Sequence, residues 1–153
     1  MKKVLILSGS PRKGGNSDIL CDQFAKGALE MGNEVEKICI AEKKIAPCSG
    51  CYFCKNNGGR CVFNDDMGDI LQKIIDCDVL VLSSPVYFYS ISAQLKAVID
   101  RTVARWTEIS NKDRQKEKSS SVQAGGSTIS VTVWRARCRH LPISAFFPIL
   151  LAC

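Results

Sequence analysis

The sequence predicts an α/β fold in which a doubly wound parallel sheet carries helices on both faces. Residues 4–7 and 79–82 are apolar at every position, which is typical of parallel strands buried on both sides. Amphipathic helical segments alternate with the strand-like segments along the first two thirds of the chain. We expect the strand order 2-1-3-4-5 with right-handed crossovers.

The periodicity of the apolar residues and the residues at the segment ends predict three strands and three helices in the regular part of the chain. Residues 4–7 predict a central strand, residues 35–40 an edge strand with polar alternation, and residues 79–82 a second buried strand. Three helices are expected over residues 18–31, 65–76 and 92–106. The predicted caps are Asn16 or Ser17 for the first helix, which ends at Gly32, and Asp65 or Asp66 for the second. The first helix is expected to bury Ile19, Leu20, Phe24, Ala28 and Met31; the third is expected to bury Leu95, Val98, Ile99, Val103 and Trp106.

The pattern changes beyond residue 110. Residues 110–127 are polar, residues 128–134 alternate as an edge strand would, and an apolar stretch interrupted by Pro148 ends the chain. We therefore divide the chain into residues 1–110, the regular domain, and residues 111–153, an atypical tail. The hypothesis for this tail is an aberrant completion of the same domain, such as a frameshifted ending. The alternative is an extension that binds an acidic partner or nucleic acid.

Composition places the chain among soluble globular proteins. Its 153 residues favour one domain, with 46% hydrophobic and 24% charged residues. No signal-peptide pattern or membrane-spanning stretch is visible, so we expect a cytoplasmic protein without a membrane partner. The net charge of +6 arises mostly in the tail, where residues 111–153 hold 7 Lys/Arg and 2 Asp/Glu. A nucleic-acid partner is therefore not expected for the main body.

Residues 8–17 have the composition of a phosphate-binding loop between a strand and a helix. Gly-rich backbone and a helix N-terminus direct N–H groups at an anion. Gly15 stands where a P-loop requires Lys, which argues against a nucleoside triphosphate and for a monophosphate. The alternative is an ordinary strand-to-helix connection. The candidate side-chain donors are Ser8, Ser10, Arg12, Asn16 and Ser17.

A second loop is predicted over residues 83–90, after the second buried strand. Its apolar and aromatic residues would form a slot for a flat ring: Pro85, Val86, Tyr87 and Phe88. The alternative is that these side chains cap the core. In the expected topology both loops lie at the point where the winding of the sheet reverses. A phosphate loop beside an aromatic slot suggests flavin mononucleotide (FMN).

Four of the nine cysteines are closely grouped, at Cys48, Cys51, Cys54 and Cys61. Their C-x2-C-x2-C-x6-C spacing favours a [4Fe–4S] cluster over zinc, which usually takes two separated C-x2-C pairs. Free or redox-active thiols are the other alternative. Lys55 and Arg60 would offset the negative charge of a cluster.

These motifs together resemble one protein family. The loop GSPRKGGNS, the cysteine run and the segment SPVYFYSISAQLKAVIDR at residues 84–101 are similar to the flavodoxin-like NAD(P)H-dependent FMN reductases, above all to the iron–sulfur flavoproteins. The resemblance covers about residues 1–106. It implies a flavodoxin-like fold, and a homodimer or homotetramer with flavin sites near subunit contacts. It also implies that Ser10, Arg12, Asn16 and Ser17 hold the FMN phosphate, and that Pro85, Val86, Tyr87 and Phe88 contact the isoalloxazine.

The sequence thus suggests an FMN-binding oxidoreductase. It would take electrons from NADH or NADPH, or another donor, and pass them to an unknown acceptor, through a [4Fe–4S] cluster if the cysteines bind one. No catalytic side chain is expected, because the flavin carries the chemistry. The alternative function is a non-enzymatic electron carrier or a cysteine-based redox sensor with the same fold.

Overall fold

The computed structural model describes residues 1–114, 120–123 and 129–135. The apolar stretch predicted at the end of the chain lies outside these residues. No helix in the described ranges is long and apolar enough to cross a membrane. The elements in chain order are β1 (Lys3–Ser8), α1 (Asn16–Glu30), β2 (Glu34–Cys39), η1 (Ile40–Glu42), α2 (Phe53–Asn56), α3 (Met67–Asp76), β3 (Val79–Tyr87), β4 (Ser90–Ile91), α4 (Ala93–Arg101), η2 (Thr102–Arg105), α5 (Trp106–Arg114), β5 (Ser120–Gln123) and β6 (Ile129–Arg135).

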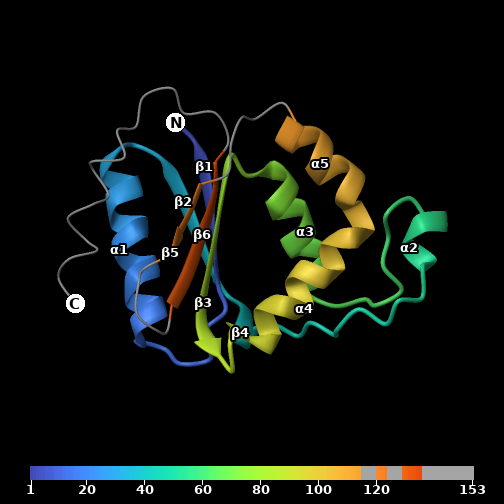
Figure 1. Ribbon diagram of the computed structural model, residues 1–153. Helices are drawn as coiled ribbons and strands as arrows, with labels where there is room; N and C mark the ends of the chain where they lie inside the picture. Colours follow the sequence, from blue (N-terminus) through green and yellow to red (C-terminus); the bar gives the residue numbers. More distant parts are fainter. Residues whose placement is uncertain (115–119, 124–128, 136–153) are drawn as a thin grey trace.

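The sheet has the order β2-β1-β3-β6-β5, and β4 pairs with the end of β3. Strands β2, β1 and β3 are parallel, with β2 at the edge as its polar alternation predicts. Helix α1 covers one face of the sheet, while α3, α4 and α5 lie on the other (Figure 1). The predicted doubly wound α/β fold is confirmed, and the winding reverses between β1 and β3.

The far side of the sheet differs from the parallel order that the sequence suggested. Strand β6 runs antiparallel to β3, with the register Val79↔Arg135 to Pro85↔Ile129. Strand β5 pairs antiparallel with β6 and takes the edge, so the predicted edge strand at residues 128–134 is an interior strand. The polar composition of β5, Ser120–Gln123, gave no strand signal. Because β6 is antiparallel to β3 and β5 is antiparallel to β6, β5 runs parallel to β3.

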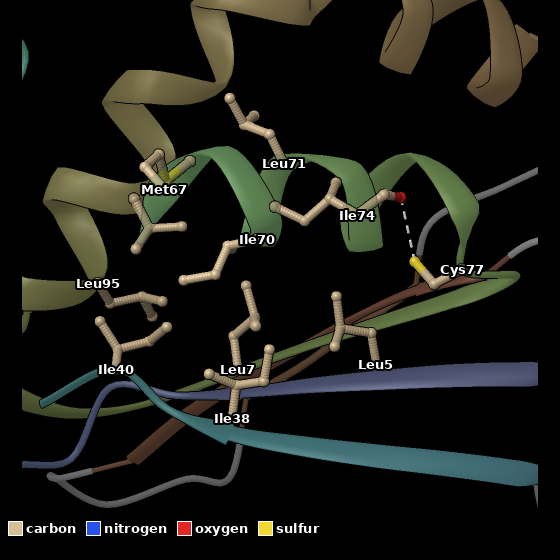
Figure 2. Packing of buried hydrophobic residues seen from close by; sticks show 11 residues of the cluster. Leu5, Leu7, Ile38, Ile40, Met67, Ile70, Leu71, Ile74, Cys77 and Leu95 are labelled. Carbon is tan, nitrogen blue, oxygen red and sulfur yellow. Dashed lines mark hydrogen bonds between the residues drawn. The ribbon is translucent and has the colours of Figure 1, made fainter. Parts of the chain in front are cut away.

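Two apolar clusters hold the layers together. Alternate residues of β1 point to opposite faces, as the period of a strand requires. Val4 and Ile6 pack with Cys21 and Ala28 of α1. The larger cluster lies between the sheet and α3, where Ile70 of α3 points toward Leu7 of β1 (Figure 2). Its buried members are Leu5, Leu7, Ile38, Ile40, Met67, Ile70, Leu71, Ile74, Cys77, Leu95 and Val98.

Some predicted core positions are exposed. In α1, Ile19 and Met31 are 49% and 62% exposed, because the buried face of this helix passes through Ser17, Asp18, Cys21 and Ala28. Val103 and Trp106 are also more than half exposed. The helix predicted over residues 92–106 ends at Arg101, and the 3₁₀ turn η2 rotates the following side chains off the core face.

Of the predicted helix ends, the start of α1 differs from the structure, whereas the cap of α3 and the end of α1 are confirmed. The N-cap of α1 is Gly15, and neither Asn16 nor Ser17 occupies that position. The N-cap of α3 is Asp66, but it is the Asp65 carboxylate that accepts a hydrogen bond from the Met67 amide, at 3.2 Å. Gly32 follows α1 with φ +74°, the left-handed conformation expected after a helix end.

Candidate functional site

The two loops predicted to converge meet at the carboxyl ends of β1 and β3. The Gly9 amide donates a hydrogen bond of 2.7 Å to the Ser83 carbonyl, and the Ser83 hydroxyl donates to the Ser17 carbonyl at 3.3 Å. A Cβ on Gly9 would lie 2.8 Å from Leu95 Cβ and 2.9 Å from Ser92 Oγ. Only glycine permits this close approach, so Gly9 fixes the loop against the start of α4.

Local hydrogen bonds fold residues 8–17 back on themselves. The Ser10 hydroxyl accepts from the Arg12 amide at 3.2 Å and donates to the Arg12 carbonyl at 3.1 Å. Gly14 has φ +68°, and its amide donates to Asp18 Oδ2 at 2.9 Å. The sequence analysis missed Asp18 as a residue of this loop. Its position in the first helical turn, four residues after a glycine, was the available signal.

Asp18 is neutralised from a neighbouring strand. Lys37 Nζ on β2 lies 2.6 Å from Asp18 Oδ1 and 2.6 Å from Asp22 Oδ1. The hydrogen bonds from Lys37 and from the Gly14 amide lower the pKa of Asp18 below its ordinary value. Burial alone would lower the pKa of Lys37, but its bonds to Asp18 and Asp22 raise it. Because this carboxylate is both paired and hydrogen-bonded, it adds little uncompensated negative charge to the loop.

The predicted phosphate donors of the loop differ in their exposure to solvent. Ser8 and Ser17 are buried at its floor, and the Ser8 hydroxyl has no hydrogen-bond partner within the described residues. Arg12 and Asn16 are exposed at its rim. The first turn of α1, which begins at Asn16, leaves backbone N–H groups without partners inside the helix. Orphaned donors at a helix N-terminus beside a glycine-rich turn fit a phosphate group.

The segment predicted as a loop at residues 83–90 is a hairpin. Strand β3 continues to Tyr87, and β4 pairs back through Val86↔Ile91 and Tyr87↔Ser90. Phe88 and Tyr89 form the turn with φ 46° and 65°, and both are almost fully exposed. Their rings meet edge to face with centroids 5.8 Å apart. Pro85 and Val86 are half-buried, so the role of these residues in binding a ring stays a prediction.

The four grouped cysteines belong to an excursion of the chain, residues 47–64, which we call the cysteine excursion. It includes the short helix α2, which lies away from the sheet beyond α4 (Figure 1). Hydrogen bonds close its base: the Lys44 amide donates to Asp66 Oδ2 at 2.7 Å, and the Ala46 amide to Asp65 Oδ2 at 3.0 Å. At its far side Gly59, with φ +80°, packs so closely that a Cβ would lie 3.0 Å from the Ala104 carbonyl.

All four cysteines line one cavity of about 110 Å³. Within the described ranges, no three Cys, His, Asp or Glu side chains form a group suited to a single metal ion. A cluster such as [4Fe–4S] places each thiolate on a separate iron, so its ligands surround a volume instead of a point. The four cysteines that line this cavity are the kind and number of ligands that such a cluster takes. Its other lining residues are Ser49, Gly50, Tyr52, Val62, Phe63, Arg101, Val103 and Ala104.

The buried cation at this cavity is Arg101, which the sequence analysis did not single out. Its side chain is only 2% exposed. Arg101 Nη1 pairs with Asp65 Oδ2 and donates to the Ala46 carbonyl at 3.2 Å, and the guanidinium lies 5.3 Å from the Phe63 ring centroid. Leu95, Val98 and Arg101 share one helix face at intervals of three residues, and this spacing was the available signal.

The cations predicted from sequence sit elsewhere. Lys55 lies over the Tyr52 ring, 4.7 Å from its centroid, and Arg60 is exposed. Neither lines the cavity. Among the cysteines, Cys51 is exposed, and hydrogen bonds from the Phe53 amide and the Ser49 hydroxyl lower the pKa of its thiol. A lowered pKa favours the thiolate, the form that binds metals and reacts with oxidants.

Comparison with known proteins assigns the family. The family model of NADPH-dependent FMN reductases matches residues 2–131, which is most of the chain. The chain therefore belongs to the NADPH-dependent FMN reductase family. The match extends past residue 106, where the resemblance noted from the motifs ends.

Individual relatives are iron–sulfur flavoproteins. One from Methanocaldococcus jannaschii is 44% identical over 100 residues, which cover 65% of this chain and 51% of the relative. One from Archaeoglobus fulgidus is 45% identical over 101 residues, which cover 66% of this chain and 45% of the relative. The chain thus spans about half the length of these relatives.

A solved structure supports the fold. The crystal structure of RosB with bound 8-demethyl-8-formylriboflavin-5′-phosphate aligns with a TM-score of 0.54 at 21% identity. The alignment covers 66% of this chain and 42% of RosB. The likeness agrees with the flavodoxin-like α/β arrangement described above.

Proposed function

We propose that this protein is an FMN-dependent oxidoreductase that accepts electrons from NADH or NADPH and passes them to an acceptor through a [4Fe–4S] cluster. The observation that carries the proposal is the contact of Gly9 with Ser83 and Ser92, which brings the loop 8–17 to the switch point of the sheet. Ligands of open α/β sheets bind at such points. Membership of the FMN reductase family supplies the identity of the ligand.

Each part of the loop has a proposed task toward FMN. Ser8, Ser10, Asn16 and Ser17, with the N-terminus of α1, donate hydrogen bonds to the phosphate, and Arg12 closes over it from the rim. Residues 85–88 of the hairpin contact the ring. When bound, FMN supplies both one-electron and two-electron chemistry, so no protein side chain has to carry the reaction.

The cysteine excursion supplies the proposed second centre. The thiolates of Cys48, Cys51, Cys54 and Cys61 hold a [4Fe–4S] cluster in the cavity that they line. The closed base of the excursion keeps these ligands in a fixed position relative to α4. When bound, a cluster supplies one-electron transfer.

One anaerobic experiment tests both centres. The purified protein is reconstituted with FMN, ferrous iron and sulfide, desalted, and assayed for the three components and by absorbance. We expect about one FMN and about four iron and four sulfide per chain. Bleaching of the flavin absorbance by NADH or NADPH should follow. Protein that takes up no FMN, or that takes up zinc in place of iron, would contradict the proposal.

The second candidate function is a non-enzymatic electron carrier or a cysteine-based redox sensor. The exposure of Cys48 and Cys51 and the lowered pKa of the Cys51 thiol favour it. A sensor would lose free thiols reversibly on exposure to mild peroxide and would bind no iron. A carrier would be reduced by a chemical reductant but not by a nicotinamide.

We also propose a cytoplasmic location and a homodimer or homotetramer, following the resemblance to the family. Light scattering after size-exclusion chromatography measures the assembly directly. A monomer at micromolar concentration, with FMN bound, would contradict the oligomer without affecting the flavin site.

A further inference from the structure

Arg101 combines burial, charge and an unused hydrogen-bond donor at the cysteine cavity. Its Nη1 is held by Asp65 and by the Ala46 carbonyl, so the guanidinium cannot turn freely. Its Nε is buried and has no hydrogen-bond partner within the described residues. A buried donor left unpaired loses its hydrogen bonds to water without replacement, so a partner is expected for it in the working protein.

The unpaired donor belongs to a side chain that forms part of the wall of the cavity. Arg101 lines it together with the four cysteines. An arginine guanidinium stays protonated in proteins, and that of Arg101 pairs with the Asp65 carboxylate. The side chain is therefore a permanent cation beside Cys61. Among the described residues that line the cavity, it is the one with a formal positive charge.

We infer that Arg101 is a positioning residue of the cysteine site, whose Nε–H donates to a sulfur of the bound cluster and whose charge stabilises its reduced form. This inference rests on the proposed cluster. Reduction adds one negative charge to the bound group, and a hydrogen-bonded cation in a buried wall stabilises that charge. Asp65 holds the guanidinium in place and neutralises part of its charge when the cavity is empty.

The test compares reduction potentials. Wild type, Arg101→Gln and Arg101→Lys are reconstituted anaerobically with FMN, iron and sulfide, and the midpoint potential of the cluster is measured by redox titration with electron paramagnetic resonance. For Arg101→Gln we expect about a tenfold smaller equilibrium constant for reduction, which is a shift of about −59 mV for one electron. Arg101→Lys keeps the charge but lacks the fixed Nε–H, so its shift should have the same sign and be smaller.

Arg105→Gln is the matched control. It removes the same charge from the same stretch of chain, but the Arg105 side chain is bonded to Glu108 and Gln72 and does not line the cavity. Its potential should equal that of wild type. An equal shift of the midpoint potential in Arg105→Gln and Arg101→Gln would mean that the shift follows from the change in net charge alone. That result would overturn the assignment.

The remaining outcomes separate this inference from the proposed function. Wild type that binds no iron overturns both. Arg101 variants that bind the cluster and keep the wild-type midpoint potential overturn the role of Arg101 and leave the proposed function standing. Arg101→Gln protein that keeps its FMN and melting temperature but loses iron supports it. Should Arg101→Gln fail to fold, the double variant Arg101→Leu/Asp65→Leu removes both buried charges together. Its shift should have the same sign as that of Arg101→Gln but be smaller, because the Asp65 carboxylate, which opposes reduction, is removed as well.

Discussion

The phosphate loop and the cysteine excursion are built in opposite ways, although both are irregular, glycine-containing segments. The loop of residues 8–17, proposed to bind phosphate, is attached to the sheet near both of its ends, through Gly9 to Ser83 and through Ser17 to Ser83. The cysteine excursion, residues 47–64, is attached at its base through Asp65 and Asp66, and at one further point through Gly59.

This difference shows where each site obtains its rigidity. The loop of residues 8–17 is held by the parallel sheet, because backbone hydrogen bonds and the close packing of Gly9 fix the position of its hydrogen-bond donors. The excursion depends on a few side-chain bonds, above all the buried pair of Asp65 and Arg101. Substitutions at the two attachments should therefore affect one site and spare the other.

The largest effect is expected from Asp65→Asn. It leaves the Arg101 cation buried without its carboxylate and should lower the free energy of unfolding by about 3–5 kcal/mol. Urea unfolding measures this. Iron uptake should fall more than FMN binding. Asp69→Asn, an exposed change in α3 shortly after Asp65, is the control and should stay within about 0.5 kcal/mol of wild type. Equal loss of FMN and iron in Asp65→Asn would show that the two sites are not separable.

The same variant has a pH signature. Burial alone would raise the pKa of Asp65, but hydrogen bonds from Arg101, Ala46 and Met67 lower it below its ordinary value. A lowered pKa contributes stability that is fully present above the unfolded-state value, about 3.9, and is lost as the pH falls through the folded-state value. Asp65→Asn lacks this contribution. As the pH falls below about 4, the free energy of unfolding of the variant should therefore decrease less steeply than that of wild type.

Gly9→Ala tests the attachment of the phosphate loop. The new methyl group would lie 2.8 Å from Leu95 Cβ and 3.2 Å from the Ser83 carbonyl oxygen, so the loop and α4 must separate. We expect a loss of about 1–3 kcal/mol and of most FMN affinity, with iron uptake retained. Gly27→Ala in α1 has nothing within 4 Å and should stabilise by about 1 kcal/mol. Fluorescence titration of FMN and thermal unfolding give both quantities, and unchanged FMN affinity in Gly9→Ala would count against the loop as the phosphate site.

The smallest effect concerns the β3–β4 turn. Phe88 and Tyr89 hold positive φ angles that side-chain-bearing residues disfavour, whereas an Asn-Gly pair suits a two-residue turn of this kind. The double variant Phe88→Asn/Tyr89→Gly should therefore stabilise the fold by about 1–2 kcal/mol, measured by thermal unfolding. FMN affinity should fall if the Phe88 ring contacts the flavin. A gain in stability with unchanged affinity would remove Phe88 from the proposed contacts.

The sequence predicted the parallel core well, because fully apolar runs such as residues 79–82 have few alternatives to a buried strand. It also predicted that the two loops converge, since this follows from topology alone. It predicted a strand at residues 128–134 but not its antiparallel, interior position as β6, and it missed the pairing of Asp65 with Arg101. Both depend on contacts between residues far apart in the chain. Asp65 was assigned to a helix cap, and that local role is only one of the two that its carboxylate performs.

Helix α4 connects the loop of residues 8–17 to the cysteine cavity. Its first residues adjoin Ser92, which touches Gly9, and its last residue is Arg101 at the cysteine cavity. Nine helical residues span about 13 Å, so the two attachments lie about that far apart along one helix. Any sliding of α4 along its axis therefore moves both attachments by the same amount. The proposed flavin and cluster sites therefore share one structural element, and a displacement of α4 is the geometric link between them.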